Sequence, residues 1–124
     1  MQGPAKHRER SLTRREDDWL RCAGCSHQVA LWSERISFDG GFEHQFTNPA
    51  GFEFAIDLFA QAPGTQGPGG APWTGDFSWF TGYEWETAYC GGCRQHLGWS
   101  FRSDSPPSPG EPPEFSGLIL ARLV

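Results

Sequence analysis

The clearest pattern in this sequence is an alternation of hydrophobic and polar residues over positions 52–58. A period of two places one set of side chains on one face of a β-strand and the other set on the opposite face. The hydrophobic face carries Phe52, Phe54, Ile56 and Leu58, and the opposite face carries Glu53 and Asp57. We therefore predict a strand over this segment. The preceding residues 48–51 read Asn-Pro-Ala-Gly, which is typical of a turn.

Weaker patterns predict further strands and no helix. Alternation or short hydrophobic runs indicate strands at residues 29–32, 42–46, 95–102 and 118–124. The last of these is interpreted as a terminal buried strand. No segment shows a convincing helical period, so the chain is predicted to be all-β, with one folded domain over residues 19–124.

Long irregular segments separate the predicted strands. The chain holds 16 glycines and 10 prolines, a composition typical of short strands joined by turns and loops. Residues 60–76 are predicted to form one long loop, and residues 103–114 a second irregular segment. Residues 79–85 are also interpreted as irregular, because Gly82 interrupts a run of aromatic residues.

Charge divides the chain into a polar arm and an acidic body. The net charge is −5, yet residues 1–21 hold six of the ten basic residues. We interpret residues 1–18, which are almost free of hydrophobic residues, as a flexible arm. The rest of the chain has four basic and eleven acidic residues. An acidic body repels phosphate backbones, which argues against nucleic-acid binding.

Hydropathy indicates a soluble protein. No hydrophobic run approaches the length of a membrane span, and the N-terminal residues lack the apolar core of a signal peptide. We therefore expect a cytoplasmic protein. In that reducing compartment, paired cysteines are metal ligands more often than disulfides.

The four cysteines form two Cys-x-x-Cys pairs, Cys22 with Cys25 and Cys90 with Cys93, separated by sixty-four residues. Two such pairs are the ligand set of a closed, tetrahedral structural zinc site. On separate hairpins they would clamp two sheets together through one Zn²⁺. Gly24 offers a positive φ in the first turn. Two disulfides, a redox pair and an iron–sulfur cluster are the competing interpretations.

Other candidate groups have no clear role beside four thiolates. All four cysteines are needed as ligands, so none is left as a nucleophile. Zinc also needs no fifth ligand. The histidines are therefore expected to be surface or structural residues, and they are His7, His27, His44 and His96.

Three tryptophans, Trp79, Trp85 and Trp99, flank the second cysteine pair. Large aromatic side chains most often bury area in a core. Two of these three stand in the segment predicted to be irregular, where a core would more often use aliphatic strand residues. Three indole walls could also form a cage for a small flat ring or a cation. The residues alone leave both interpretations open.

Several motifs together resemble the CULT domain, the thalidomide-binding domain of cereblon. The motifs are Ser78-Trp79-Phe80-x-Gly82-Tyr83-x-Trp85, Cys90-x-x-Cys93 and Gly98-Trp99-x-Phe101, with Cys22-x-x-Cys25 and Asn48-Pro49-x-Gly51 in matching order. The resemblance covers roughly residues 19–123. It implies a bacterial single-domain homologue with two antiparallel sheets set at an angle and pinned by zinc. It also implies an aromatic cage in the larger sheet.

The resemblance assigns roles to individual residues. The three tryptophans would form the cage walls, and Phe101 would close the base. Backbone groups of Phe77 and Trp79 would bond the imide of a ligand, and the Asn-Pro turn would border the mouth. Eukaryotic cereblon has His where this chain has Phe77, so only a backbone contact is expected there. The implied ligand-binding set is Asn48, Pro49, Phe77, Ser78, Trp79, Trp85, Trp99 and Phe101.

On this resemblance we expect a non-catalytic module that binds cyclic imides, such as glutarimide and thalidomide-type compounds, and uracil-like rings. One alternative is a cage for methyl-ammonium ligands, because Asp76, Glu84 and Glu86 lie near the tryptophans. Another is a zinc-containing enzyme acting on a small ring amide, although the sequence offers no paired acid and base. The chain is expected to be a monomer. Its length leaves no room for eukaryotic ligase-docking segments, so no ubiquitin-ligase adaptor is expected as a partner.

Overall fold

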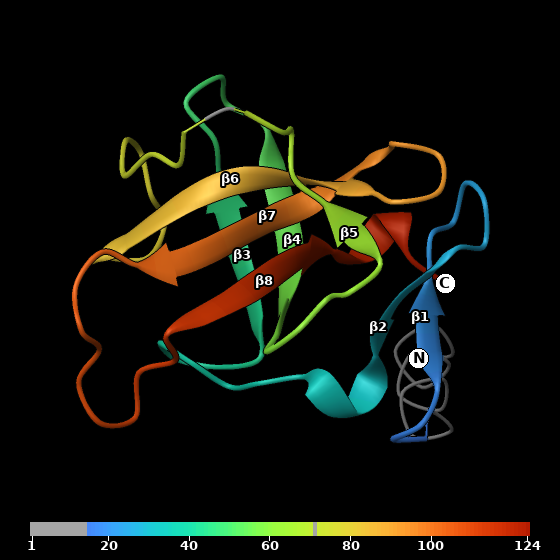
Figure 1. The fold of residues 1–124 in the computed structure, drawn as a ribbon, viewed down its shortest axis with the longest axis horizontal. Helices are drawn as coiled ribbons and strands as arrows, with labels where there is room; N and C mark the ends of the chain where they lie inside the picture. The colour runs from blue at the N-terminus through green and yellow to red at the C-terminus, as the bar shows by residue number, and fades with distance from the viewer. Residues whose placement is uncertain (1–14, 71) are drawn as a thin grey trace, which may run out of the picture.

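The computed structural model describes residues 15–70 and 72–124. Over these ranges the chain forms two antiparallel sheets, and its helical segments are two 3-10 turns of three residues each (Figure 1). The predicted all-β class with two antiparallel sheets is confirmed. Since the described helices are this short, none of them could span a membrane. The arm predicted for residues 1–18 lies mostly outside the described residues, so its extent stays a prediction.

The smaller sheet is a hairpin of β1 (Trp19–Arg21) and β2 (Gln28–Leu31), and its turn carries the first cysteine pair. It lies beside the larger sheet, at the right of Figure 1. Arg21 exchanges two backbone hydrogen bonds with Val124, and Cys22 pairs with Leu123. The segment that follows the larger sheet therefore extends the smaller one. After β2, the 3-10 turn η1 (Trp32–Glu34) leads the chain towards the larger sheet.

The larger sheet has the strand order β3-β4-β8-β7-β6-β5, with every neighbouring pair antiparallel. The hairpin β6–β7 carries the second cysteine pair in its turn. The strands are β3 (Glu43–Thr47), β4 (Glu53–Phe59), β5 (Thr65–Gln66), β6 (Tyr83–Cys90), β7 (His96–Ser103) and β8 (Glu114–Ile119).

A hydrophobic cluster lies on each face of the larger sheet. Leu118 belongs to a cluster packed against the smaller sheet, which we call the small-sheet cluster, and its neighbour Ile119 belongs to an aromatic cluster on the opposite face. Successive side chains of a strand point to opposite faces, so β8 is buried on both sides. The small-sheet cluster contains Leu20, Cys22, Val29, Ala30, Phe59, Cys90, Leu97, Leu118 and Leu123. The aromatic cluster contains Ile56, Leu58, Phe80, Tyr83, Trp99, Phe101, Phe115 and Ile119.

The predicted terminal strand has the wrong bounds. Residues 118–124 were expected to form one strand, but β8 begins at Glu114 and ends at Ile119. The chain then makes the 3-10 turn η2 (Leu120–Arg122), which carries Leu123 out of the larger sheet and against Cys22. A single hydrophobic run thus contributes residues to both sheets. Hydrophobic periodicity does not show where the chain leaves one sheet for the other. The irregular segment predicted for residues 103–114 also loses its first residue to β7 and its last residue to β8.

Other boundaries also differ from the prediction. Trp85 lies in the regular strand β6 rather than in an irregular segment, because its backbone pairs with Phe101 of β7. The loop predicted for residues 60–76 contains the two-residue strand β5 and a bridge from Thr74 to Trp85. The predicted strand over residues 29–32 loses its last residue, since Trp32 begins η1.

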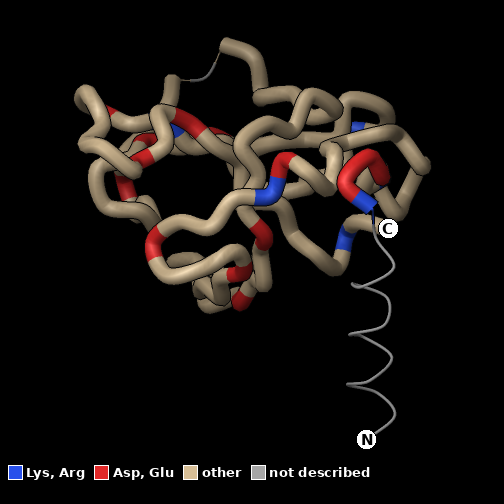
Figure 2. The backbone as a smooth tube through the Cα atoms, turned by 90° about the horizontal axis from the view of Figure 1, so that it is seen from below, with Lys and Arg blue, Asp and Glu red and all other residues tan. Residues whose placement is uncertain are grey.

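Asp57 departs from the exposure typical of acidic residues. Asp and Glu outnumber Lys and Arg along the described backbone (Figure 2). Unlike most acidic residues, Asp57 is buried, with only 2% of its surface exposed. Its two carboxylate oxygens accept hydrogen bonds from Arg35 Nε and an Nη, at 2.7 and 2.9 Å. The guanidinium also packs over the rings of Trp32 and Phe42, at 4.4 and 4.7 Å. This ion pair ties the segment after η1 to β4.

Arg35→Ala should destabilise the fold by about 3–5 kcal/mol, because it leaves a buried carboxylate without its partner. Arg35→Lys should cost less, since it keeps the charge but loses the two-pronged geometry. Urea unfolding of the three proteins measures the difference. Equal stability of Arg35→Ala and the unmodified protein would contradict a structural role for this pair.

Candidate metal centre and aromatic pocket

The two cysteine pairs converge on one point between the sheets. The Sγ atoms of Cys22, Cys25, Cys90 and Cys93 all lie within 4.8 Å of one another. Two of the cross-pair distances are 3.7 Å, from Cys22 to Cys93, and 3.6 Å, from Cys25 to Cys90. Sulfurs held at about 2.3 Å from a tetrahedral zinc are about 3.8 Å apart. The four cysteines, all unpaired by disulfides, could therefore hold a metal ion.

The two turns that present the cysteines have the same local structure. In each turn the residue after the second cysteine, Ser26 or Arg94, has a positive φ of 67° or 69°. Its N–H bonds to the carbonyl of the first cysteine, at 2.8 Å for Cys22 and 2.9 Å for Cys90. The left-handed residue of the first turn is thus Ser26, and the positive φ predicted for Gly24 is wrong.

The four thiols differ in acidity. Burial by itself raises the pKa of Cys90. The N–H groups of Cys93 and Gly92 and the neighbouring thiols together have the larger effect, and they lower the pKa to about 7. Burial is the main cause that raises the pKa of Cys22. For Cys25 the His27 N–H lowers the pKa, while burial and the other thiols raise it to about 12. Four thiolates at this separation repel one another, and a cation removes that penalty.

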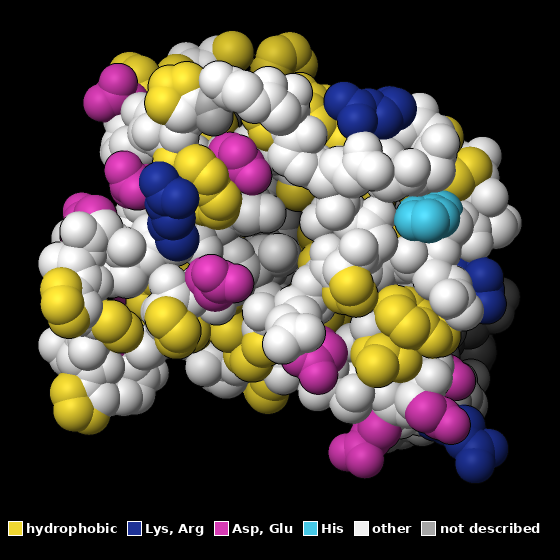
Figure 3. All heavy atoms as spheres, viewed as in Figure 1, with side chains coloured by type: hydrophobic (Ala, Val, Ile, Leu, Met, Phe, Trp, Pro, Cys, Tyr) yellow, Lys and Arg dark blue, Asp and Glu magenta, His cyan; other side chains and the backbone are white. Residues whose placement is uncertain are grey.

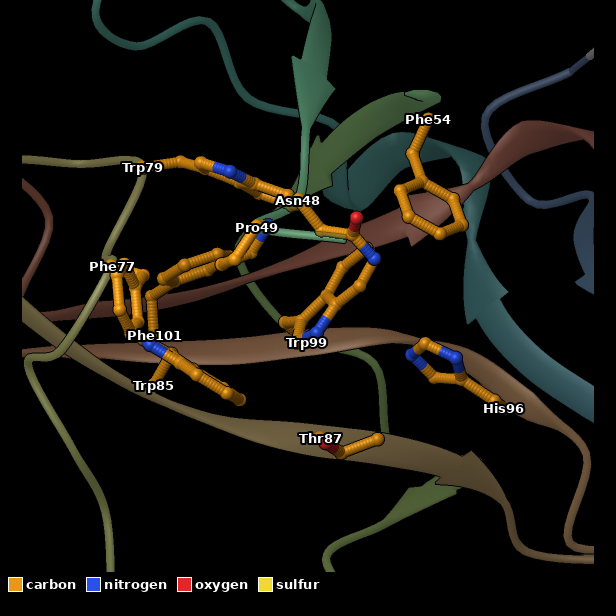
Figure 4. Close-up of a pocket in the computed structure, with 10 residues that line it drawn as sticks. All are labelled: Asn48, Pro49, Phe54, Phe77, Trp79, Trp85, Thr87, His96, Trp99 and Phe101. Atoms are coloured by element: carbon orange, nitrogen blue, oxygen red, sulfur yellow. The ribbon is translucent and has the colours of Figure 1, made fainter. Parts of the chain in front are cut away.

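A pocket of about 400 Å³ lies against the aromatic cluster (Figure 4). The rings of Trp79 and Trp85 lie on either side of Phe101, and Phe77 and His96 lie at opposite ends. The side chains come from the β3–β4 turn, β4, the loop before β6, β6 itself and β7. In that order they are Asn48 and Pro49, Phe54, Phe77 and Trp79, Trp85 and Thr87, then His96, Trp99 and Phe101.

Hydrogen bonds to backbone carbonyls hold two of the three indoles. Trp79 Nε1 donates to the Thr47 carbonyl at 3.2 Å, and Trp85 Nε1 donates to the Asp76 carbonyl at 2.7 Å. Trp79 also stacks on Phe46, with ring centroids 4.8 Å apart and planes 8° apart. These contacts fix the orientation of both rings while leaving a face of each towards the pocket.

Trp99 and Phe101 form the deeper part of the pocket. Trp99 meets Trp79 edge to face, with centroids 4.7 Å apart and planes 76° apart. Phe101 is only 2% exposed and packs against Phe80 and Phe115 in the aromatic cluster. Phe54 covers another side of Trp99, with centroids at 5.1 Å. The pocket floor is thus part of the hydrophobic core.

The loop before β6 presents backbone groups at the mouth. Phe77 has a φ of +59°, which is costly for a residue with a Cβ and is often found at functional sites. Its side chain is 75% exposed. Among the described residues, neither the Phe77 C=O nor the Trp79 N–H has a hydrogen-bond partner. One unpaired acceptor and one unpaired donor therefore stand two residues apart beside the pocket.

The remaining predicted site residues divide into two groups. Asn48 and Pro49 line the pocket, where the Asn48 side-chain oxygen accepts a bond from the Phe52 N–H that closes the turn. Ser78 does not line it. Its hydroxyl donates to the Phe80 carbonyl and accepts from the Phe80 N–H, so it shapes the loop.

Three lining residues were not predicted as part of the site: Phe54, Thr87 and His96. Phe54 and Thr87 carry no distinguishing signal beyond strand periodicity. His96 was interpreted as a surface or structural residue, yet its ring meets Trp99 edge to face at 4.8 Å. In a regular strand, a residue three positions before Trp99 points to the opposite face, so strand periodicity gave no signal for His96.

These features define an all-β domain of two antiparallel sheets, with a four-cysteine centre that could hold a metal and an aromatic pocket beside it. No protein-family model matches the chain. It is 31% identical to the protein cereblon of Drosophila melanogaster over 96 residues and to that of Drosophila grimshawi over 99 residues. Each alignment covers 76% of this chain, but only 16% and 14% of those relatives. The chain therefore carries a cereblon-like domain of the CULT type and spans about a sixth of the length of the curated relatives it matches.

The neighbours of His96 imply a pH-dependent stability. Burial lowers its pKa below the ordinary value of 6.5, the bond to the Gly98 carbonyl raises it, and the charge of Arg122 lowers it further. A carbonyl only accepts, so the Nε2 atom, 3.0 Å from the Gly98 oxygen, carries the proton of the neutral ring.

Folding stability should fall as pH drops below about 6.5, because the unfolded chain then binds a proton that the folded protein does not. His96→Gln should show a smaller loss of stability than the unmodified protein between about pH 7 and about pH 5. Urea unfolding at both pH values, with metal content held equal, tests this. An identical pH dependence in both proteins would refute the assignment.

Proposed function

We propose that this domain is a non-catalytic binding module that holds cyclic imides and uracil-like rings in the aromatic pocket, with one structural zinc in the four-cysteine centre. The observation that carries the proposal is the combination of three indoles around one pocket with an unpaired backbone acceptor and donor at its mouth. The identity to cereblon over most of the chain supports it. A bacterial origin, a monomeric state and a cytoplasmic location remain predictions.

The chemistry of a cyclic imide matches this arrangement. An imide has one N–H between two carbonyl groups on a small ring with apolar edges. The Phe77 carbonyl would accept from the imide N–H, and the Trp79 N–H would donate to one imide oxygen. The indole faces of Trp85 and Trp99 would cover the ring. Apolar walls with a few directed polar groups are typical of small-molecule sites.

Charge favours a neutral ligand over a methyl-ammonium ion. Cations in aromatic cages gain from nearby carboxylates as well as ring faces. None of the carboxylates considered for this role, those of Asp76, Glu84 and Glu86, is among the pocket-lining residues. Glu84 instead accepts a hydrogen bond from Arg102 at 2.9 Å, on the outer face of β6 and β7.

The lining also favours binding over catalysis. Among the described residues that line the pocket, His96 is the titratable side chain, and its Nε2 is already bonded to a backbone carbonyl. General acid–base chemistry on a ring amide needs a second positioned group near the first. The four cysteines would all be zinc ligands, which leaves no open metal position.

Glutarimide should bind with micromolar affinity. Its ring has about eight heavy atoms, each contributing about 0.6–1 kcal/mol, between the limits for tiny and drug-sized ligands. N-methylglutarimide should bind more weakly by about 1–3 kcal/mol, since the Phe77 carbonyl would lose its donor on burial. Tryptophan fluorescence titration measures both affinities. Equal affinity of the two compounds would overturn the proposed pose.

Trp85→Ala should abolish measurable glutarimide binding while retaining zinc content and fold, because this wall is partly exposed when the pocket is empty. Trp32→Ala is a matched control for losing one tryptophan away from the pocket, and should retain binding. Calorimetric titration of the two variants separates the outcomes. Unchanged glutarimide binding by Trp85→Ala would contradict the assignment of the aromatic pocket as the imide-binding site.

Elemental analysis should find one zinc per chain. Cys90→Ser should unfold the protein or release the metal, since metal binding contributes on the order of 10 kcal/mol to folding in structural zinc sites. His27→Ala, beside the centre but not needed as a ligand, should keep its zinc. A metal-free Cys90→Ser protein with native stability would contradict a structural metal.

A further inference from the structure

A second cavity lies on the opposite face of the larger sheet from the aromatic pocket. In β7, Trp99 and Phe101 point into the aromatic cluster, so the side chain of Ser100 between them points to the other face. The second cavity has a volume of about 360 Å³, and Ser100 lines it. We call it the outer crevice. Figure 3 shows this face of the molecule, hollowed near its centre over β7 and β8.

The floor of the outer crevice carries two unpaired hydroxyl groups. Ser100 of β7 and Ser116 of β8 are direct cross-strand partners, and both line the cavity. Ser116 is only 8% exposed, yet its hydroxyl makes no hydrogen bond with the other described residues. Ser100 has none either. None of the described residues has a buried side-chain polar atom without a partner, so the Ser116 oxygen is open to the cavity, where the donor of a ligand can reach it.

The charge around the crevice is negative. Glu114, two residues before Ser116 on the same face of β8, is the charged side chain among those that line the cavity. It has no ion-pair partner among the described residues. The guanidinium of Arg102 packs over Trp73 at 4.4 Å, and Glu84 neutralises it. An anionic ligand would be repelled here and a cationic one attracted.

We propose that the outer crevice binds a small primary alkylammonium group. The ammonium has three donors, which match the hydroxyl oxygens of Ser100 and Ser116 and the carboxylate of Glu114. The alkyl chain would lie against the apolar side of the cavity, made by Ala60, Ala62 and Pro63. A neutral polyol would use the same hydroxyls but gain nothing from the carboxylate, so charge decides between the two ligands.

Titration with n-butylammonium chloride tests the proposal. With few heavy atoms it should bind in the millimolar range, and should shift the backbone amide signals of Ser100 and Ser116 in two-dimensional NMR spectra. Ser116→Ala and Glu114→Gln should each weaken binding about three- to tenfold. Raised salt should weaken it further. Because Glu114 is exposed at the start of its strand, its variant tests the site even if Ser116→Ala unfolds the protein.

Matched controls separate this site from other features of the domain. Glu53→Gln removes a carboxylate from the far end of β4 and should leave binding unchanged. Trp85→Ala should abolish imide binding but leave n-butylammonium binding unchanged. The test of the outer crevice is therefore independent of the test of the aromatic pocket. Binding of 1-butanol as tight as that of n-butylammonium would overturn the proposal. The proposal would also be overturned if Glu114→Gln bound n-butylammonium as tightly as the unmodified protein, or if Trp85→Ala lost this binding.

The same ammonium chemistry is presented by polyamines and by lysine side chains. Putrescine and Nα-acetyl-lysine amide, titrated in parallel, distinguish these sources by which one binds more tightly than n-butylammonium. Absence of binding by all three compounds would refute an ammonium site in the outer crevice.

Discussion

The arrangement of this domain depends on the convergence of four cysteine sulfurs from two hairpin turns. A two-stranded sheet is only marginally stable by itself, and the β1–β2 hairpin gains its support where its turn meets the β6–β7 turn. One cysteine of each pair is buried in the small-sheet cluster, and the other faces solvent. Two of the four cysteines, Cys22 and Cys90, are therefore also core residues, so any change in the metal centre is transmitted directly to the packing between the sheets.

The aromatic pocket follows from that arrangement because its walls are attached to rigid elements. Trp85, Trp99 and Phe101 stand on the paired strands β6 and β7, and Trp79 is held by its bond to the end of β3 and by stacking on Phe46. Rings fixed in this way lose little conformational entropy when a ligand enters. The mouth is built differently, from the left-handed Phe77 and its unpaired carbonyl. Rigid walls give the pocket its shape, and the loop supplies its polar selectivity.

Much of the fold and site could be predicted from sequence, since the relevant signals are local. Strict alternation located β4, and the cysteine spacing indicated a four-thiolate centre. Three features could not be found in this way. The hydrophobic run after residue 118 leaves one sheet for the other, which only the pairing of Leu123 with Cys22 reveals. Asp57 is buried because Arg35 reaches it from twenty-two residues away. His96 lies beside a one-residue shift in the pairing of β6 with β7, which interrupts the strand alternation, and no motif marks it.

The backbone bonds between Arg21 and Val124 join positions at opposite ends of the described chain. Closing so long a loop costs entropy before any contact repays it, and folds dominated by such distant pairings form slowly. The β6–β7 hairpin, whose partners are close in sequence, can form first. The β1–β2 hairpin is also local, but its pairing with the segment after β8 must wait until the larger sheet has formed. During that interval the hydrophobic side chains of β8 and the free thiols stand exposed together, so the period of greatest vulnerability to aggregation and oxidation comes late in folding.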